Sequence, residues 1–181
     1  MAKSWPEAPP MTIRTDAKYR ATLRTSEGDI VADLFPEDAP ITVNSFVFLA
    51  RQGYYDGVPF HRVINGFMVQ TGDPTGTGTG GPGYRFRDEM ITKDYEPGTL
   101  AMANSGPHTN GSQFFICHAD LKGRLPKSYT IFGKVRQGSD VVDRIASAPV
   151  GRSGSGEQSS PVNTITVNTV TIDEEAVDPT T

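Results

Sequence analysis

Cysteine is almost absent from this chain of 181 residues: Cys117 is the one thiol, so no disulfide can form within the chain. It lies in the apolar run 114–117, where a buried and inert thiol is expected rather than a nucleophile. No stretch approaches the roughly 20 apolar residues of a membrane-spanning helix, and the first residues lack the apolar core of a signal peptide. We therefore expect a soluble cytoplasmic protein with no membrane partner.

An excess of positive charge is also lacking. The chain has 17 Lys and Arg residues against 21 Asp and Glu residues, a formal net charge of −4. Proteins that bind nucleic acid regardless of sequence are normally basic, so we expect no nucleic-acid partner. The length suits one domain with a substantial core.

Metal-ligand spacing and hydrolase motifs are missing as well. None of His61, His108 and His118 stands at a metal-like spacing from another His or Cys. No nucleophile elbow is present. The glycine-rich stretch 75–83 lacks the Lys and hydroxyl residue of a P-loop, and no helix follows it as in a dinucleotide fingerprint. We expect no metal and no cofactor, and we interpret this stretch as a loop that forms the wall of a ligand site.

Glycine and proline, in contrast, are abundant: 19 and 14 residues are spread along the chain. This composition favours many turns between short strands. Residues 19–25 and 30–34 alternate apolar and polar side chains on either side of a Gly-containing turn, which predicts a hairpin. Further strands are predicted, in chain order, at residues 60–73, 100–104, 112–117, 129–135 and 165–172.

Two helices are predicted among these strands. Pro40 suits a first helical turn, Asp38 is a candidate N-cap, and Gly53 is placed to end the helix. A second, amphipathic helix is predicted over 140–146. With about seven or eight antiparallel strands, a closed barrel is the most economical arrangement.

The domain organisation follows from the same patterns. Residues 1–17 carry three prolines and little periodicity, which indicates an extended N-terminal arm that Trp5 would pin to the domain. Residues 18–173 form the folded domain. The acidic residues 174–181 are expected to be a disordered tail.

The least ordinary stretch is Phe60 to Asp73. Its apolar residues recur on a short period, as in a buried strand, yet His61, Arg62 and Gln70 are set among them. Long polar side chains are costly to bury without partners. Either these groups are satisfied inside a core, or they line a pocket for a polar ligand. The apolar and amide residues elsewhere favour a groove that grips a peptide.

Several segments together resemble the signature of the cyclophilins, in the order of that family and over roughly residues 19–172. These segments are Phe60-His-Arg-Val-Ile64, Gly66-Phe-Met-Val-Gln70, Gly72-Asp73, Met102-Ala-Asn104, Asn110-Gly-Ser-Gln-Phe-Phe-Ile116 and Phe132-Gly-Lys-Val135. The resemblance implies a closed, eight-stranded antiparallel barrel capped by two α-helices. It also implies a peptidyl-prolyl cis/trans isomerase that acts on proline-containing peptides and on folding proteins.

The resemblance implies roles for individual residues. Arg62 would be the catalytic residue, donating to the prolyl nitrogen. The pocket for the proline ring would consist of Phe67, Met68, Phe115 and Leu125. The residues that hold the substrate backbone and orient Arg62 would be Gln70, Ala103, Asn104 and Gln113.

The chain departs from the best-known eukaryotic members of the family between Cys117 and Tyr129, where it is about one residue longer. Arg124 then stands in place of a tryptophan important for cyclosporin binding, and Tyr129 in place of a pocket histidine. Tyr129 keeps the aromatic wall and a polar tip, a change associated with bacterial members. Cyclosporin-type ligands are expected to bind weakly.

A second hypothesis is a proline-peptide binding or chaperone module in which turnover is incidental. The joint presence of Arg62, Gln70 and Gln113 favours the isomerase, because binding alone would not require that arginine. The absence of an appended domain suits a general folding helper that acts as a monomer.

Overall fold

The structure, a computed structural model, describes residues 3–176. It is mostly β with two helices, as the sequence predicts. The elements in chain order are β1 (Ala17–Thr25), β2 (Gly28–Leu34), α1 (Pro40–Arg51), β3 (Val58–Pro59), β4 (Arg62–Ile64), β5 (Met68–Thr71), β6 (Thr99–Met102), β7 (Phe114–Cys117), β8 (Ile131–Gln137), α2 (Ser139–Ala146), β9 (Val150–Arg152), β10 (Gln158–Pro161) and β11 (Thr166–Ala176). None of the helices in 3–176 is long and apolar enough to cross a membrane.

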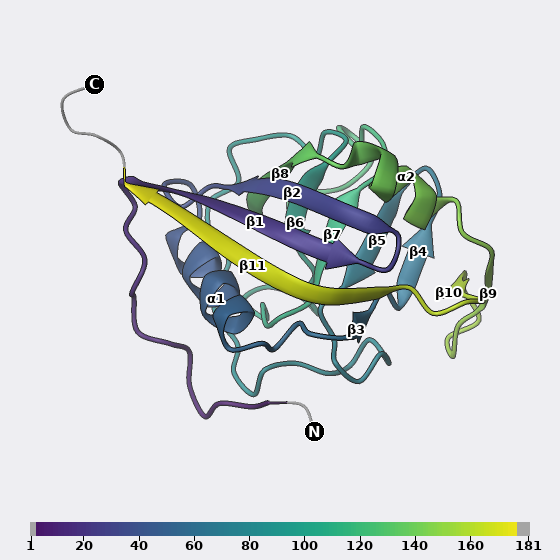
Figure 1. The fold of residues 1–181 in the computed structure, drawn as a ribbon, viewed down its shortest axis with the longest axis horizontal. Helices are drawn as coiled ribbons and strands as arrows, with labels where there is room; N and C mark the ends of the chain where they lie inside the picture. The colour runs from purple at the N-terminus through teal and green to yellow at the C-terminus, as the bar shows by residue number, and fades with distance from the viewer. Residues whose placement is uncertain (1–2, 177–181) are drawn as a thin grey trace.

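Nine strands form one curled antiparallel sheet in the order β3-β11-β1-β2-β8-β6-β7-β5-β4, and β9 and β10 form a separate hairpin (Figure 1). The predicted closed barrel of eight strands is therefore not what is found: within 3–176 the hydrogen-bonded ladder does not join β3 to β4. The reason lies in the chain path. Only Phe60 and His61 separate the two strands, and across them the backbone turns from pairing with β11 to pairing with β5.

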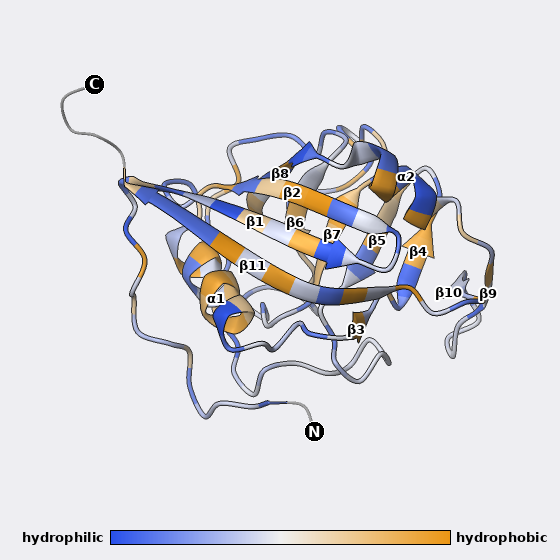
Figure 2. Ribbon diagram, in the orientation of Figure 1, coloured by the Kyte–Doolittle hydropathy of each residue, from blue (hydrophilic) through white to orange (hydrophobic). Residues whose placement is uncertain are grey.

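The predicted hairpin is confirmed as β1 and β2, joined by Ser26 and Glu27. Side chains alternate between faces along a strand, and Figure 2 shows the resulting alternation of apolar and polar residues along β1, β2 and β11. The apolar set of this hairpin is buried in the main core, and its members are Tyr19, Ala21, Leu23, Ile30, Ala32 and Leu34.

Helix α1 packs through Phe46 against this core. The Phe46 ring lies 5.4 Å from that of Phe114 and 5.2 Å from that of Phe132, measured between centroids. Gly53 follows the helix with φ +71°, and its N–H donates to the Ala50 carbonyl. This left-handed conformation suits glycine, so the predicted helix end is confirmed.

The predicted cap of α1 is wrong. The helix has no side-chain cap from its own segment, and Asp38 pairs with Lys93 instead. Glu89 supplies the acceptors from another part of the chain: its carboxylate accepts from Ile41 N at 3.0 Å, from Thr42 N at 2.7 Å and from Thr42 Oγ1 at 2.7 Å. A carboxylate at this end also complements the helix dipole.

The N-terminal residues 3–16 contain no helix or strand and run alongside α1 (Figure 1). The Trp5 ring packs against Phe48 and Tyr54, at centroid distances of 5.1 and 5.9 Å. Its backbone N–H donates to Pro82 O at 2.8 Å. The arm is thus attached both to α1 and to the glycine-rich loop.

At the other end of the chain, β11 continues to Ala176. The prediction of a disordered tail from residue 174 is therefore wrong for residues 174–176, which lie in the sheet. Pairing with Ala17–Tyr19 of β1 uses backbone groups and does not depend on acidic side chains, and Tyr19 also donates to the Glu174 carboxylate. The rest of the predicted tail, 177–181, lies outside the described residues.

The distant cap of α1 leads to a first prediction. Glu89→Ala removes three accepted hydrogen bonds and should lower the free energy of unfolding by about 1–2 kcal/mol, measured as a lower urea midpoint at unchanged slope. Asp38→Ala is the control, because it breaks only an exposed ion pair and should cost about 0.5 kcal/mol or less. A larger loss for Asp38→Ala would return the capping role to Asp38.

Candidate functional site

The register of three strands places the polar residues of the 60–73 stretch. Arg62 on β4 lies opposite Gln70 on β5, and Gln70 lies opposite Phe115 on β7. Their neighbours Val63 and Val69 face the other way and are fully buried in the main core. The first alternative, that Arg62 and Gln70 are satisfied within the core, is therefore excluded. Both are half-buried on the outer face of the sheet.

A second, smaller apolar cluster covers this outer face. Its buried members Met68 and Phe115 are flanked by the partly buried Phe67, Leu125 and Tyr129. The Tyr129 ring stands edge-on to Phe115 at a centroid distance of 5.6 Å. The Tyr95 hydroxyl, which donates to Tyr129 O at 2.7 Å, fixes the backbone beneath that ring.

A cavity of about 750 Å³ opens beside this cluster. It is lined by nine of the ten site residues that the family resemblance implies, namely Arg62, Phe67, Met68, Gln70, Ala103, Asn104, Phe115, Leu125 and Tyr129. Gln113 does not line this cavity but contacts a residue that does: Gln70 Nε2 donates to Gln113 Oε1 at 3.1 Å. Residues spread over 68 positions of sequence thus meet at one place.

Arg62 is the cation at the edge of this cavity. Its Nε donates to Glu157 Oε1 at 2.8 Å and its Nη2 to Glu157 Oε2 at 3.0 Å. Its Nη1 lies 3.4 Å from Gln70 Oε1. The guanidinium carbon is 5.9 Å from the Phe67 ring centroid, over its face. Its Nη1 is also 4.0 Å from Met68 Sδ, a weak acceptor. A guanidinium carries five N–H groups, so one, on Nη2, has no partner among residues 3–176.

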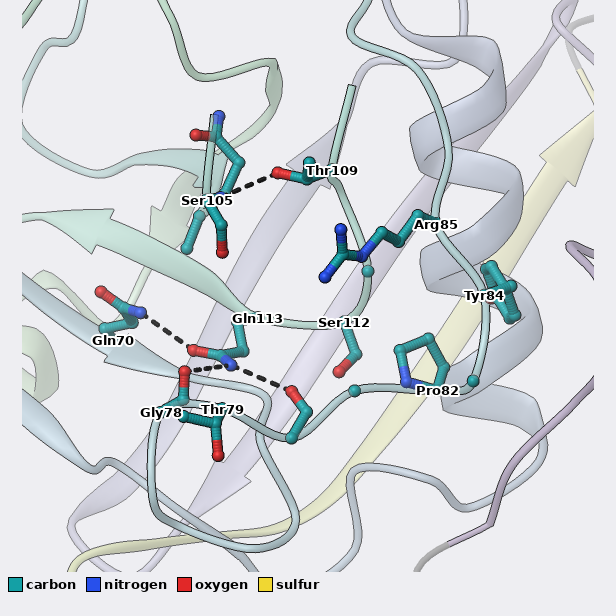
Figure 3. A pocket seen from close by; sticks show the side chains of 16 residues that line it. Gln70, Gly78, Thr79, Pro82, Tyr84, Arg85, Ser105, Thr109, Ser112 and Gln113 are labelled. Carbon is teal, nitrogen blue, oxygen red and sulfur yellow. Dashed lines mark hydrogen bonds between the residues drawn. The ribbon is translucent and has the colours of Figure 1, made fainter. Parts of the chain in front are cut away.

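Gln113 ties the Arg62–Gln70 pair to the glycine-rich loop. Its Nε2 donates to the carbonyls of Gly78 and Gly80, each at 3.0 Å. Figure 3 shows the Gln113 amide between Gln70 and this loop. The loop lines both the first cavity and a second of about 850 Å³, which shares Gln70, Ala103 and Asn104 with the first. The loop is thus a cavity wall, as predicted.

Asp73 holds the glycine-rich loop from within. It is fully buried and accepts from Thr75 N and Gly78 N, at 2.8 and 2.7 Å, and from Gly80 N at 3.0 Å. A Cβ on Gly80 would lie 2.0 Å from the carboxylate, so only glycine fits there. Burial alone would raise the pKa of Asp73, but the hydrogen bonds from Thr75, Gly80 and Gly78 outweigh it and the pKa is lowered.

Neither His61 nor Cys117 carries the features of a reactive group. Both ring nitrogens of His61 are buried without a hydrogen-bond partner among residues 3–176. Burial lowers the pKa of His61, which keeps the ring neutral. Burial raises the pKa of Cys117 to about 12, as expected for an inert thiol. Within 3–176 no group of three or more His, Cys, Asp or Glu side chains could hold a metal ion.

Sequence reasoning missed the far wall of the first cavity. This wall is the hairpin of β9 and β10, which contributes Glu157 and a set of small residues, namely Ser153, Gly154, Ser155, Ser159 and Ser160. The polar composition of 153–160 predicts only a loop. No local pattern could place Glu157 next to Arg62, 95 positions away.

Three comparisons with known proteins agree. Residues 20–172 match the family model described as cyclophilin type peptidyl-prolyl cis-trans isomerase/CLD. The chain is 46% identical over 129 residues to a peptidyl-prolyl cis-trans isomerase of Helicobacter pylori, covering 69% of this chain and 78% of that one. It is 49% identical over 135 residues to the human peptidylprolyl isomerase domain and WD repeat-containing protein 1, covering 72% of this chain but only 21% of that one.

Among solved structures, the chain is similar to a Cryptosporidium parvum cyclophilin type peptidyl-prolyl cis-trans isomerase crystallised in the presence of the dipeptide Ala-Pro. The TM-score is 0.78 at 35% identity, covering 85% of this chain and 98% of that one.

The hydrogen bonds that Asp73 accepts from the glycine-rich loop lead to a second prediction. Asp73→Asn replaces an acceptor oxygen with an NH₂ group that faces two donors, and should lower the free energy of unfolding by about 2–3 kcal/mol. Because the native pKa of Asp73 is lowered, its stabilising contribution is present above the ordinary pKa of about 3.8 and is lost as pH falls through the native value.

Acid unfolding curves test this directly: the wild type should lose that contribution below about pH 4, and Asp73→Asn should lack that part of the transition. Thr75→Ser keeps both donors to Asp73 and serves as the control. Equal acid sensitivity of wild type and Asp73→Asn would contradict the assignment.

Proposed function

The chain belongs to the cyclophilin-type peptidyl-prolyl cis-trans isomerases, and we propose that Arg62 is the residue with which it accelerates rotation about Xaa-Pro bonds. The observation that carries this proposal is the position of Arg62. A permanently charged donor, with one N–H group that no residue of 3–176 accepts, stands at the edge of a cavity that has an apolar cluster as one wall.

The reaction requires neither a nucleophile nor a metal, because no covalent bond is made or broken. The Xaa-Pro amide resists rotation through delocalisation of the nitrogen lone pair, with a barrier of about 18–20 kcal/mol. Uncatalysed exchange takes tens to hundreds of seconds. When the amide twists, the lone pair localises on the prolyl nitrogen. A donor aimed at that nitrogen binds the twisted form more strongly than the planar form, which is the condition for acceleration.

Arginine suits this role for two reasons. It stays charged throughout the accessible pH range, and its planar fork holds the direction of its donors. An acceleration of about 10⁵ requires about 7 kcal/mol, of which one charge-assisted hydrogen bond supplies about 1.5–3 kcal/mol. The remainder must come from excluding water and from anchoring one side of the amide while the other side turns.

The cavity offers both kinds of anchor. We propose that the apolar cluster takes the proline ring, through Phe67, Met68, Phe115, Leu125 and Tyr129. The polar and backbone groups that would hold the substrate chain are Gln70, Ala103, Asn104 and Gln113. Two hydrogen bonds that fix these residues in place support this role. Asn104 Nδ2 donates to Ser128 O at 2.8 Å, and Ala103 N donates to Gln113 O at 3.0 Å. Proline-containing peptides and folding proteins are the proposed substrates.

The third prediction tests Arg62. Arg62→Ala should lower kcat/KM for a short Xaa-Pro peptide about 100- to 1,000-fold, the usual cost of removing a preorganised donor, measured as cis/trans exchange by NMR. Arg62→Lys should recover little, because a lysine lacks the planar fork. Arg20→Ala is the control, because Arg20 pairs with Asp33 away from the cavity.

Near-full activity of Arg62→Ala would refute the assignment of Arg62. A wild-type protein that binds the peptide without accelerating its exchange would instead favour a proline-peptide binding module.

The fourth prediction concerns cyclosporin. Arg124 is exposed and does not line the cavity, and we propose that it stands where the cyclosporin-binding members of the family carry a tryptophan. Arg124→Trp should therefore bind cyclosporin more tightly than the wild type, by about tenfold, the gain expected for one added aromatic contact. Titration that shows no gain would count against this alignment of residues 117–129.

A further inference from the structure

The pairing of Arg62 with Glu157 is bidentate and uses one particular edge of the guanidinium. The carboxylate engages Nε and Nη2, at 2.8 and 3.0 Å. Nε lies on one side of the guanidinium, so this edge is distinct from the edge formed by Nη1 and Nη2. The second N–H of Nη2 lies on the Nη1–Nη2 edge and has no partner among residues 3–176, while Nη1 contacts Gln70 and Met68.

We propose that Glu157 is a positioning residue for Arg62: it fixes the plane of the guanidinium so that the Nη1–Nη2 edge faces the proline pocket. The proposal rests on the proposed catalytic role of Arg62 and assigns a function to the hairpin of β9 and β10.

The hairpin is built to present Glu157 at this place. The backbone of Glu157 accepts from Ser153 N at 2.7 Å, and Gly156 N donates to Ser153 O at 2.9 Å, so the turn is closed directly before the carboxylate. Gln158 Nε2 donates to Val150 O at 2.9 Å across the hairpin. Strand β10 packs against β4, which carries Arg62.

The two contacts of Arg62 act together. Gln70 fixes Nη1 from β5, and Glu157 fixes Nε and Nη2 from the hairpin. An arginine side chain has many rotamers and loses them only when several partners hold it. With Gln70 alone, at a long 3.4 Å, the guanidinium would keep much of that freedom. Glu157 is therefore the stronger of the two restraints.

The charge state of the pair supports a permanent restraint rather than a switch. The Arg62 guanidinium, and the Ser159 hydroxyl after it, lower the pKa of Glu157 to about 2. The carboxylate is therefore ionised wherever the protein is folded near neutral pH, and the geometry of Arg62 does not change with pH in that range.

The opposite role, a carboxylate that blocks Arg62, is disfavoured by the same geometry. A blocking group would occupy the N–H groups that the substrate needs. Glu157 instead occupies the Nε side, and the cavity stays open at about 750 Å³ with Arg62 and Glu157 both in its lining.

The fifth prediction is the test. Glu157→Gln keeps the size of the side chain but removes one acceptor oxygen and the charge. We expect kcat for a short Xaa-Pro peptide to fall about tenfold, the effect of a misplaced catalytic group, with KM changed less than about twofold. Glu157→Asp keeps the carboxylate and should recover part of the loss. Glu96→Gln is the matched control, because Glu96 pairs with Lys134 at 2.9 Å outside both cavities.

A spectroscopic readout separates positioning from a general effect on folding. In the wild type the Nε–H proton of Arg62 should give an NMR resonance protected from exchange with water, and this protection should be lost in Glu157→Gln. The urea midpoint should change little, because partly exposed ion pairs contribute little to stability.

A double variant distinguishes the failure of this proposal from the failure of the proposed function. In an Arg62→Ala background, Glu157→Gln should cause no further loss of activity. An undiminished or increased kcat in the single variant, or a full further loss in the Arg62→Ala background, overturns the positioning role. Full activity of Arg62→Ala itself overturns the proposed function.

Discussion

The register that sets Arg62 opposite Gln70 is the constraint on which the site depends. A shift of one residue in a strand exchanges its two faces. Such a shift between β4 and β5 would move Arg62 into the core and Val63 into the cavity. The fully buried Val63 and Val69 on the inner face make that shift very unfavourable. The main core therefore stabilises the direction of the proposed catalytic side chain without touching it.

From that pair a continuous set of hydrogen bonds runs in both directions. One branch passes from Gln70 through Gln113 to the carbonyls of Gly78 and Gly80, and ends at the buried carboxylate of Asp73. The other passes from Arg62 to Glu157. Two carboxylates thus anchor the ends of one network, and the cavity lies along it. Such networks are stiff when every member is satisfied.

Much of the fold and of the site could be predicted from the sequence, because the relevant signals are local. Alternation predicted β1 and β2, and spacing predicted both helices. The resemblance of the segments around Arg62, Gln70 and Gln113 to the cyclophilins implied which residues share a cavity. What could not be predicted depends on contacts between distant segments. Asp38 precedes the helix at a position where a cap is expected, but the carboxylate that accepts from Ile41 N and Thr42 N belongs to Glu89, far along the chain.

The same reason explains the other differences. The polar hairpin of β9 and β10 has no pattern that would indicate an ion pair with Arg62. The acidic residues at the end of β11 were predicted to be a tail. The sequence does not show that β1 begins at Ala17, where its first residues pair with the end of β11. The strand count differs because the predicted strand 60–73 is two strands, β4 and β5, which pair with each other, and because residues 58–59, predicted as a turn, form the short strand β3.

The two ends of the sheet limit how it can pair with another extended chain. The terminal strands β3 and β4 are two and three residues long, and a single stretch of backbone links them. Long unpaired edges capture extended polypeptides by strand addition and promote aggregation. Strand β11 is longer, and β3 pairs with it only at Thr166 and Val167, so residues 168–176 have no strand partner on that side within 3–176. By contrast, strand addition at β3 or β4 could engage only two or three residues.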